Sequence, residues 1–297
     1  MQFRECKIEF DKSIEDEVFS FLESLHTLGY FEILFDGERK KKESEVFQAT
    51  TQVVVYFSLD DLQKEIELIL FIQSISNALE FYHESRVIET REFENAYKEF
   101  YKPFCIGGLW IVPLWEKQDP QWKDKKVLFL NPGMAFGTGH HETTKLLLER
   151  ITELPWEKKS ILDVGTGSGI LSGAVAVSGA SKILAIDIDP NSIKAISENF
   201  KENVFPSLEE IQLEEGGFDQ PKAHAQDFDF LFANITFGVL SRNILEISNL
   251  KAKEFLFSGI ITERKSEFLE LLRIHIPGAS LWEKTFNGWE AIHWKRT

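Results

Sequence analysis

One stretch of this 297-residue chain, residues 160–189, limits the possible fold more than any other part of the sequence. An apolar run comes first, then three alternating glycines, an apolar segment long enough for a helix, and a last apolar run that ends in acid. This order predicts a strand, a glycine loop, a helix packed on a sheet and a second strand. Such a unit presents backbone N–H groups at a helix N-terminus and a carboxylate to a ribose. The glycines are Gly165, Gly167 and Gly169, and the acids are Asp163, Asp187 and Asp189.

The spacing of these glycines narrows the choice of ligand. A dinucleotide fingerprint needs a glycine at position 170, where Ile170 stands, and a phosphate-binding loop needs a Lys-Ser or Lys-Thr pair that does not follow here. S-adenosylmethionine carries no phosphate, so Asp163 beside the loop is compatible with it, and Asp187 is placed to accept from both ribose hydroxyls. The pattern resembles the class I methyltransferase signature and predicts S-adenosylmethionine as the cofactor. The alternative is an ordinary glycine turn of an α/β protein.

A second glycine-rich stretch lies before the first strand of that unit. Three glycines within residues 133–139 let the backbone approach a ligand closely, and a helix over 145–152 is predicted to follow. The plainer interpretation is a helix capped by the hydroxyl of Thr143. The His-His-Glu run at 140–142 lacks the H-E-x-x-H spacing of a zinc helix, so we predict no metal site.

The third informative stretch is an apolar run over 228–233 that ends in Asn234. The carboxyl ends of the strands are where α/β folds place their chemistry. Methyltransferases that act on bases or amides often have two prolines and a tyrosine after such an Asn, which form a clamp for a planar nitrogen. Here Ile235 and Thr236 follow, which favours an aliphatic amine, and we predict that Asn234 orients it for catalysis. The alternative is a turn residue at a strand end.

Composition limits the partners and the compartment. The formal net charge is -15 and the pI about 5.0, which argues against nucleic-acid binding through phosphate contacts and suits a cationic substrate. Cys6 and Cys105 are isolated and have neither metal-type nor disulfide spacing, as in a reducing compartment. The sequence shows neither a secretory signal nor a membrane-spanning run, so we expect a cytoplasmic protein. We also expect it to be a monomer.

Three segments are predicted along the chain. Residues 1–90 follow the order β-α-β-β-α-β of a ferredoxin-like domain, residues 91–115 form a linker helix and strand, and residues 116–297 form the cofactor-binding domain. In the last segment strands alternate with helices, as in a parallel Rossmann-like sheet, and Asn287-Gly288 indicates an antiparallel C-terminal hairpin. The expected strands cover 3–10, 30–35, 51–57, 86–88, 109–112, 160–164, 182–187, 228–233, 254–258, 280–286 and 289–295, and the expected helices begin at Ser13 and at Asp60 (to about 79) and cover 92–104, 145–152 and 170–178.

Several longer motifs resemble one family more closely than the class. They are GMAFGTGHHETT, DVGTGSGILSGAVAVSGA, IDIDPNSIKAISEN, ANITFGVL, FSGII, GWEAIHWKR and the linker KPFCIGGLWIVPLWE. Together they are similar to the PrmA family, the methyltransferases of large-subunit ribosomal protein L11, over nearly the whole chain. The glycine loop is generic to methyltransferases, whereas the stretch around AFGTG and the linker are specific to this family.

The resemblance implies an activity and a set of site residues. By it, Thr144, Gly165, Asp187 and Asn234 would bind S-adenosylmethionine, and Phe136 would line the loop over it. Asp163 and Gly167 join the cofactor-binding set as members of the glycine loop. The family methylates lysine side chains and the N-terminal amine of ribosomal protein L11, and its N-terminal domain recognises that substrate.

Three rivals remain open from the sequence. One is a lysine methyltransferase of another protein, another is a small-molecule methyltransferase, and the third is a binding module without catalysis. A proton acceptor is not identified; His140 and His141 are candidates through their place in the loop alone.

Overall fold

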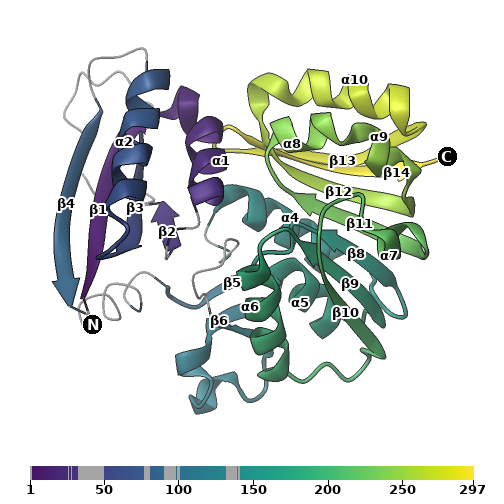
Figure 1. The fold of residues 1–297 in the computed structure, drawn as a ribbon. Coiled ribbons are helices and arrows are strands. Elements are labelled where there is room, and N and C mark those ends of the chain that lie inside the picture. The colour runs from purple at the N-terminus through teal and green to yellow at the C-terminus, as the bar shows by residue number, and fades with distance from the viewer. Residues whose placement is uncertain are drawn as a thin grey trace, which may run out of the picture. The chain divides into compact units, whose positions relative to one another are not determined.

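The chain divides into two units, residues Met1–Tyr101 and Lys102–Thr297, here called the first and second unit (Figure 1). A computed structural model describes residues 2–25, 27, 29–32, 50–76, 81–89, 98, 101–131, 139 and 141–297. The boundary between the units lies inside the predicted linker, residues 91–115, and the strand of that linker pairs with another strand of the second unit. Within the described residues, none of the helices combines the length and the apolar character needed to cross a membrane.

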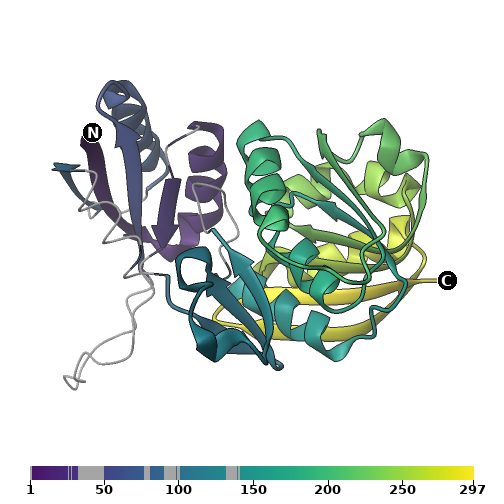
Figure 2. The same cartoon turned by 90° about the horizontal axis from the view of Figure 1, so that it is seen from below.

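The first unit is an antiparallel sheet with two helices on one face (Figures 1 and 2). Strand order is β2-β3-β1-β4, and the elements follow the predicted order along the chain. Alternate residues of β1, such as Cys6 and Ile8, face Leu22 of α1 and Leu68 of α2 in one buried core. The elements are β1 (Gln2–Asp11), α1 (Glu15–Leu25), β2 (Gly29–Glu32), β3 (Thr50–Ser58), α2 (Leu62–Ile75) and β4 (Tyr82–Glu89).

The helix starts of the first unit differ from the prediction. A 3-10 turn (Lys12–Ile14) precedes α1, and the carboxylate of Asp11 accepts a hydrogen bond from the backbone N–H of Ser13 at 2.8 Å. The helical segment is thus capped by Asp11, and Ser13, where the helix was expected to begin, lies inside the 3-10 turn. Helix α2 begins after Asp61 and not after Asp60, and it ends at Ile75. The expected extensions over 33–35, 77–79 and most of 92–104 lie outside the described residues.

The second unit is built on a mostly parallel seven-stranded sheet. Strand order is β10-β9-β8-β11-β12-β14-β13, with β14 antiparallel between its two neighbours. This is the predicted class I methyltransferase sheet with its antiparallel hairpin. Its elements are α4 (Glu142–Glu153), β8 (Ser160–Val164), α5 (Ile170–Val177), β9 (Lys182–Asp187), α6 (Pro190–Lys201), β10 (Glu210–Glu215), α7 (Pro221–His224), β11 (Asp227–Asn234), α8 (Phe237–Arg242), α9 (Ile244–Asn249), β12 (Lys251–Ile261), α10 (Lys265–His275), β13 (Gly278–Phe286) and β14 (Trp289–Arg296).

Helices cover both faces of this sheet, so its central strands are buried on both sides (Figures 1 and 2). Successive strand residues alternate between two cores: Ile161 and Phe230 face α4 and α5, whereas Leu162 and Leu231 face α8, α9 and α10. Full burial of one such side chain contributes about 1.5–3 kcal/mol. Burial on both faces explains why these strands read as continuous apolar runs in the sequence.

A smaller sheet was only partly predicted. Strand β5 (Phe104–Ile106) pairs with β6 (Leu109–Pro113), which runs parallel to β7 (Lys126–Leu130). Gly107 and Gly108 have φ angles of 53° and 85°, so they form the tight turn of a hairpin. The prediction of a helix over 92–104 was therefore wrong at its end, because residues 101–103 are not helical and Phe104 begins β5.

The C-terminal hairpin was predicted correctly. Asn287 and Gly288 link β13 to β14 with φ angles of 49° and 85°, the left-handed values that a two-residue hairpin turn requires. Strand β10, in contrast, was not predicted. It is an edge strand of intermediate burial with the sequence EIQLEE, so its apolar signal is weak.

Candidate functional site

The predicted site residues meet at the carboxyl ends of three neighbouring parallel strands. The strand order β9-β8-β11 puts the end of β9 at Asp187, the end of β8 at Val164 and the end of β11 at Asn234 along one edge. In open α/β sheets this edge is where ligands bind. Residues about 70 positions apart in the sequence, such as Val164 and Asn234, therefore lie on neighbouring strands here.

The glycine loop between β8 and α5 has the backbone that glycine permits. Gly165, Gly167 and Gly169 have φ angles of 75°, 54° and 79°, all in the left-handed region. The loop also packs closely on the residue after Asn234, which leaves no room for a side chain at Gly165. A Cβ there would lie 2.5 Å from Cγ2 of Ile235. The loop and the end of β11 thus touch directly.

Asp187 holds the loop against the end of β9. Its Oδ2 accepts a hydrogen bond from the backbone N–H of Gly167 at 2.8 Å, and its Oδ1 accepts one from Asp189 at 2.9 Å. Burial raises the pKa of Asp187, although the hydrogen bonds from those two N–H groups lower it in part. Asp187 as a residue is 8% exposed, so it is mostly enclosed. The Ser192 side chain also hydrogen-bonds this carboxylate, and the lone pairs that remain can accept a hydroxyl.

Asp163 lies beneath the loop rather than at its surface. The side chain is 1% exposed, and its Oδ2 accepts hydrogen bonds from the hydroxyls of Thr166 at 2.9 Å and Ser172 at 2.6 Å. Burial raises the pKa of Asp163 to about 6, even though both hydroxyls favour the charged form. This carboxylate therefore joins the loop to the first turn of α5, and any effect on a ligand passes through the loop.

Asn199 is a loop support that the sequence analysis missed. It is 2% exposed on α6; its Nδ2 donates to the backbone carbonyl of Ser168 at 2.9 Å, and its Oδ1 accepts from the backbone N–H of Asn131 at 2.7 Å. It joins the glycine loop to the end of β7. A signal was present, because Asn199 and Asn203 stand four positions apart, on the helix side that also carries Ile196.

Thr144 and Asn234 form the polar pair of the site. Asn234 Nδ2 donates to the hydroxyl oxygen of Thr144 at 3.1 Å, and Thr144 itself is fully buried. The Oδ1 of Asn234 is buried and accepts no hydrogen bond from the residues that the structure describes. A buried acceptor without a donor costs about 1–3 kcal/mol, which an arriving N–H or O–H group would recover. Asn234 is thus prepared to receive a donor.

The N-terminus of α4 is attached to the C-terminal hairpin. His141, and not Thr143 as in the plainer interpretation, caps the helix: its Nδ1 accepts from the backbone N–H of Thr143 at 3.3 Å, and its ring lies edge-on to Trp289, with centroids 5.0 Å apart. Asn287 Nδ2 donates to Glu142 Oε1 at 3.1 Å. These contacts fix the turn that carries Thr144.

Gly139, the last glycine of the second glycine-rich stretch, packs against the helix that follows the glycine loop. A Cβ there would lie 2.6 Å from Ile170 at the start of α5 and 2.7 Å from the ring of Phe104. Phe136 and His140 lie outside the described residues, so their predicted roles stay predictions. Within the described parts of the chain, no group of three His, Cys, Asp or Glu side chains is arranged to hold a metal ion.

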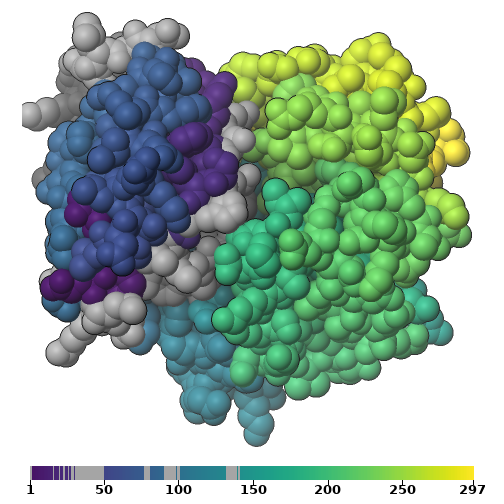
Figure 3. All heavy atoms as spheres, viewed as in Figure 1, coloured from purple at the N-terminus to yellow at the C-terminus, as the bar shows by residue number. Residues whose placement is uncertain are grey.

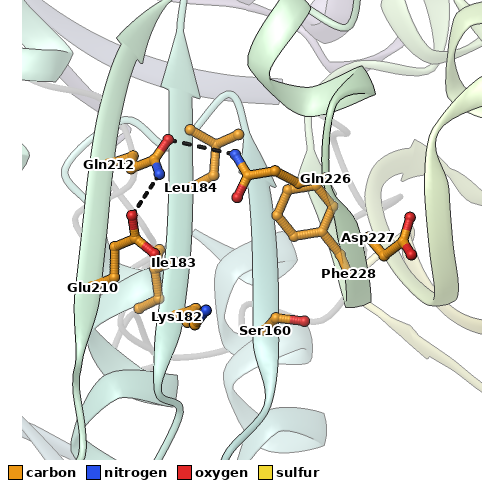
Figure 4. A pocket seen from close by; sticks show the side chains of 9 residues that line it. All are labelled: Ser160, Lys182, Ile183, Leu184, Glu210, Gln212, Gln226, Asp227 and Phe228. Atoms are coloured by element: carbon orange, nitrogen blue, oxygen red, sulfur yellow. Dashed lines mark hydrogen bonds between the residues drawn. The ribbon is translucent and has the colours of Figure 1, made fainter.

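A pocket of about 250 Å³ lies at the opposite end of the strands (Figure 4). It collects the first residues of β8 to β11, and Gln212 bridges Glu210 and Gln226 across it. We place the candidate site at the carboxyl edge instead, because the glycine loop, Asp187 and the unpaired Asn234 oxygen all lie there. The residues lining the pocket are Ser160, Lys182, Ile183, Leu184, Glu210, Gln212, Gln226, Asp227 and Phe228.

Comparison with protein families gives one match over almost the whole chain. The profile of the family described as "Ribosomal protein L11 methyltransferase (PrmA)" matches residues 2–297. A protein of Leptospira interrogans with the name ribosomal protein L11 methyltransferase is 48% identical over 300 aligned residues, covering 100% of this chain and 99% of its own length. A protein of Carboxydothermus hydrogenoformans with the same name is 37% identical, covering 68% of this chain and 65% of its own.

Among solved structures, a ribosomal protein L11 methylase from Lactobacillus delbrueckii subsp. bulgaricus is similar. It has 29% sequence identity and a TM-score of 0.56, and the match covers 66% of this chain and all of that one. Sequence and structure comparisons therefore point to the same family.

Asp163 generates a prediction about the pH dependence of stability. Because its folded-state pKa of about 6 exceeds the ordinary value of 3.8, the folded protein binds this proton more tightly, and the free energy of unfolding falls as pH rises from about 4 to above 6. Asp163→Asn cannot titrate. We expect its free energy of unfolding, relative to the wild type, to rise by about 2 kcal/mol between about pH 4.5 and pH 7.5.

Urea unfolding followed by tryptophan fluorescence measures this difference, since all seven tryptophans belong to the second unit. Asp229→Asn is the control, because hydrogen bonds from Lys253 and Ser160 outweigh burial and lower the pKa of Asp229. That variant should be less stable than the wild type at both pH values. A difference for Asp163→Asn that does not change with pH would contradict the assignment.

The close packing of Gly165 on Ile235 generates a second prediction. Gly165→Ala and Gly108→Ala both place alanine at a positive φ, but the space around Gly108 is open, whereas the new Cβ at Gly165 meets Ile235. We expect Gly108→Ala to lower the free energy of unfolding by about 1–2 kcal/mol and Gly165→Ala by about 1–3 kcal/mol more.

A double-mutant cycle separates the steric cost from the backbone cost. Ile235→Ala removes the methyl group that would collide, so the loss caused by Gly165→Ala should shrink when both changes are present. Purely additive effects in urea unfolding would show that the two residues do not touch.

Proposed function

The chain belongs to the PrmA family of ribosomal protein L11 methyltransferases, and from this premise we propose that it transfers methyl groups from S-adenosylmethionine to lysine side-chain and N-terminal amines of ribosomal protein L11. The observation that carries the proposal is the buried, unpaired Oδ1 of Asn234 beside the glycine loop. The family profile includes the first unit, which supports a protein as the substrate rather than a small molecule.

The residues at the carboxyl edge fit S-adenosylmethionine. Asp187 accepts hydrogen bonds from two backbone N–H groups and from the Ser192 side chain, and we propose that the ribose hydroxyls donate to the carboxylate capacity that remains. The positive φ angles of Gly165 and Gly167 hold the loop where a ligand can approach its backbone, and Asp163 supports that loop from below. Thr144 and Asn234 stand at the side of the same edge. When bound, the cofactor supplies an electrophilic methyl group on a sulfonium.

Asn234 would position the accepting amine. A neutral amine that donates an N–H to the Oδ1 acceptor directs its lone pair elsewhere, so this one hydrogen bond would orient the reactive form. Thr144 fixes the amide from the other side through Nδ2. An ammonium has no lone pair and cannot attack.

Deprotonation sets the remaining energetic requirement. A lysine with a pKa near 10.4 needs roughly 4–5 kcal/mol to lose its proton at pH 7, against about 1 kcal/mol for an α-amino group. Burial near a positive charge lowers this cost. We propose that the site supplies position and desolvation rather than a strong base, since the Nδ1 of His141 already serves as the cap of α4.

We further propose that residues 1–90 recognise the substrate and that the protein acts as a cytoplasmic monomer without a nucleic-acid partner. The net charge of -15 supports a basic protein substrate over nucleic acid, and the two isolated cysteines, Cys6 and Cys105, agree with a reducing compartment.

Cofactor binding is tested at Asp187. Asp187→Ala removes the acceptors of the ribose hydroxyls, so we expect the Kd for S-adenosylmethionine in calorimetric titration to rise on the order of 100-fold or more. Asp189→Ala is the matched control: it removes the cap of α6, which costs about 1 kcal/mol of stability, and should leave this Kd within about threefold. Equal affinities of Asp187→Ala and the wild type would exclude this ribose site.

Catalysis is tested at the polar pair. Asn234→Ala should lower the single-turnover rate on ribosomal protein L11 on the order of 100-fold while changing cofactor affinity much less. Thr144→Val keeps the shape of the side chain but frees the amide of Asn234, and an intermediate loss is expected. An unchanged rate for Asn234→Ala would remove this residue from the chemistry.

A further inference from the structure

The outward face of α2 carries an unusual line of apolar side chains. Leu62, Ile66 and Leu70 follow one another at intervals of four residues and are 46%, 48% and 57% exposed. Side chains with this spacing lie above one another on one side of a helix. Leu59, 41% exposed, precedes them in the turn before the helix. These four residues form what we call the α2 ridge, and the α2 segment faces the viewer in Figure 3.

The ridge is not needed for the core of the first unit. Helix α2 already packs through Leu68 and Ile72, which are fully buried. Glu65 of the same helix is also buried, and its Oε2 accepts a hydrogen bond from Arg4 Nε at 2.6 Å. Single exposed leucines are ordinary on a protein surface, but a contiguous apolar line marks an interaction site. The helix therefore has one face for the sheet and a second face for another surface.

The charge of the chain is concentrated in the unit that carries the ridge. Residues 1–101 contain 11 Lys and Arg against 22 Asp and Glu, a formal charge of -11. Residues 102–297 contain 22 against 26, a formal charge of -4, although they are almost twice as many. Exposed Asp60 and Glu67 lie beside the ridge itself. A surface of this kind attracts a partner rich in Lys and Arg.

We propose that the α2 ridge is the docking surface for the basic protein substrate, and that it receives an apolar segment of that substrate flanked by Lys or Arg. This rests on the proposed function and extends it by naming the face of the first unit that makes the contact. A second copy of the chain fits the same face poorly, because two units of formal charge -11 would be brought together.

The experiment compares two pairs of substitutions on one helix of the full chain. Ile66→Gln with Leu70→Gln removes the apolar line and retains residues that favour a helix. Gln63→Ala with Gln73→Ala is the matched control, since both glutamines are exposed on the same helix outside the line. The substrates are purified ribosomal protein L11 and a short peptide of its N-terminal residues, which has the reacting amine but not the docking segment.

We expect the Ile66→Gln/Leu70→Gln variant to raise the KM for ribosomal protein L11 at least about tenfold with little change in kcat. Its kcat/KM for the peptide and its affinity for S-adenosylmethionine should equal those of the wild type, and the glutamine control should behave as wild type throughout. Raising the salt concentration should increase the wild-type KM for the protein but not for the peptide.

Several results would overturn the proposal. An unchanged KM for the protein, or the same rise in KM for the protein and the peptide, would show that the ridge does not dock the substrate. Sedimentation in which the wild type is a dimer and the variant a monomer would assign the ridge to a second copy. A clearly lower denaturation midpoint of the variant would assign it to the chain's own packing.

Failure of the proposed function would look different. The wild type would then transfer no methyl group to ribosomal protein L11, whatever the state of the ridge. Fluorescence anisotropy of labelled ribosomal protein L11 tests the ridge separately: binding by the wild type that the Ile66→Gln/Leu70→Gln variant loses supports the docking surface, and equal or absent binding by both refutes it.

Discussion

The carboxylate of Asp187 is the interaction on which the candidate site depends. It ends β9, yet one of its oxygens holds the N–H of Gly167 in the loop after β8, and the other holds the N–H of Asp189 at the start of α6. A single side chain thereby sets the spacing between two strand ends and a helix. Remaining lone pairs on the same oxygens are available to a ligand, so the group that organises the edge is also the group that can bind there.

The burial of two neighbouring acidic side chains lowers the stability of the fold, and such a loss is typical of a functional site. Burial raises the pKa of both Asp163 and Asp187, and a neighbouring like charge raises each further: that of Asp187 on Asp163 and that of Asp189 on Asp187. An apolar residue at either position would avoid this cost but would lose the hydrogen bonds that shape the loop. The two carboxylates therefore lower stability but hold the backbone of the loop in a shape that a ligand can approach, as happens at functional sites.

The sequence predicted the parts that depend on local patterns. Apolar runs identified β8, β9 and β11, and because parallel strands share one carboxyl edge, the residues at their ends could be grouped without coordinates. Asn287-Gly288 identified the hairpin because only a few residues tolerate two positive φ angles. Asp187 and Asn234 followed from their positions at strand ends.

The parts that were missed depend on tertiary contacts. Asn199 supports the loop from a neighbouring helix, and its partners are known only once β7 and α6 are side by side. His141 caps α4 with its ring against Trp289 of a distant strand, whereas the sequence offered Thr143 as a cap only in its alternative interpretation. Strand β10 has too few apolar residues to stand out, since it forms an edge of the sheet.

A crystal structure of the full chain with S-adenosylhomocysteine tests the central claim most directly. We predict that both ribose hydroxyls donate to the carboxylate of Asp187 and that the sulfur lies beside Asn234 and Thr144. Ligand density at the opposite end of the strands, among Lys182, Glu210 and Asp227, with none at the carboxyl edge, would contradict the account.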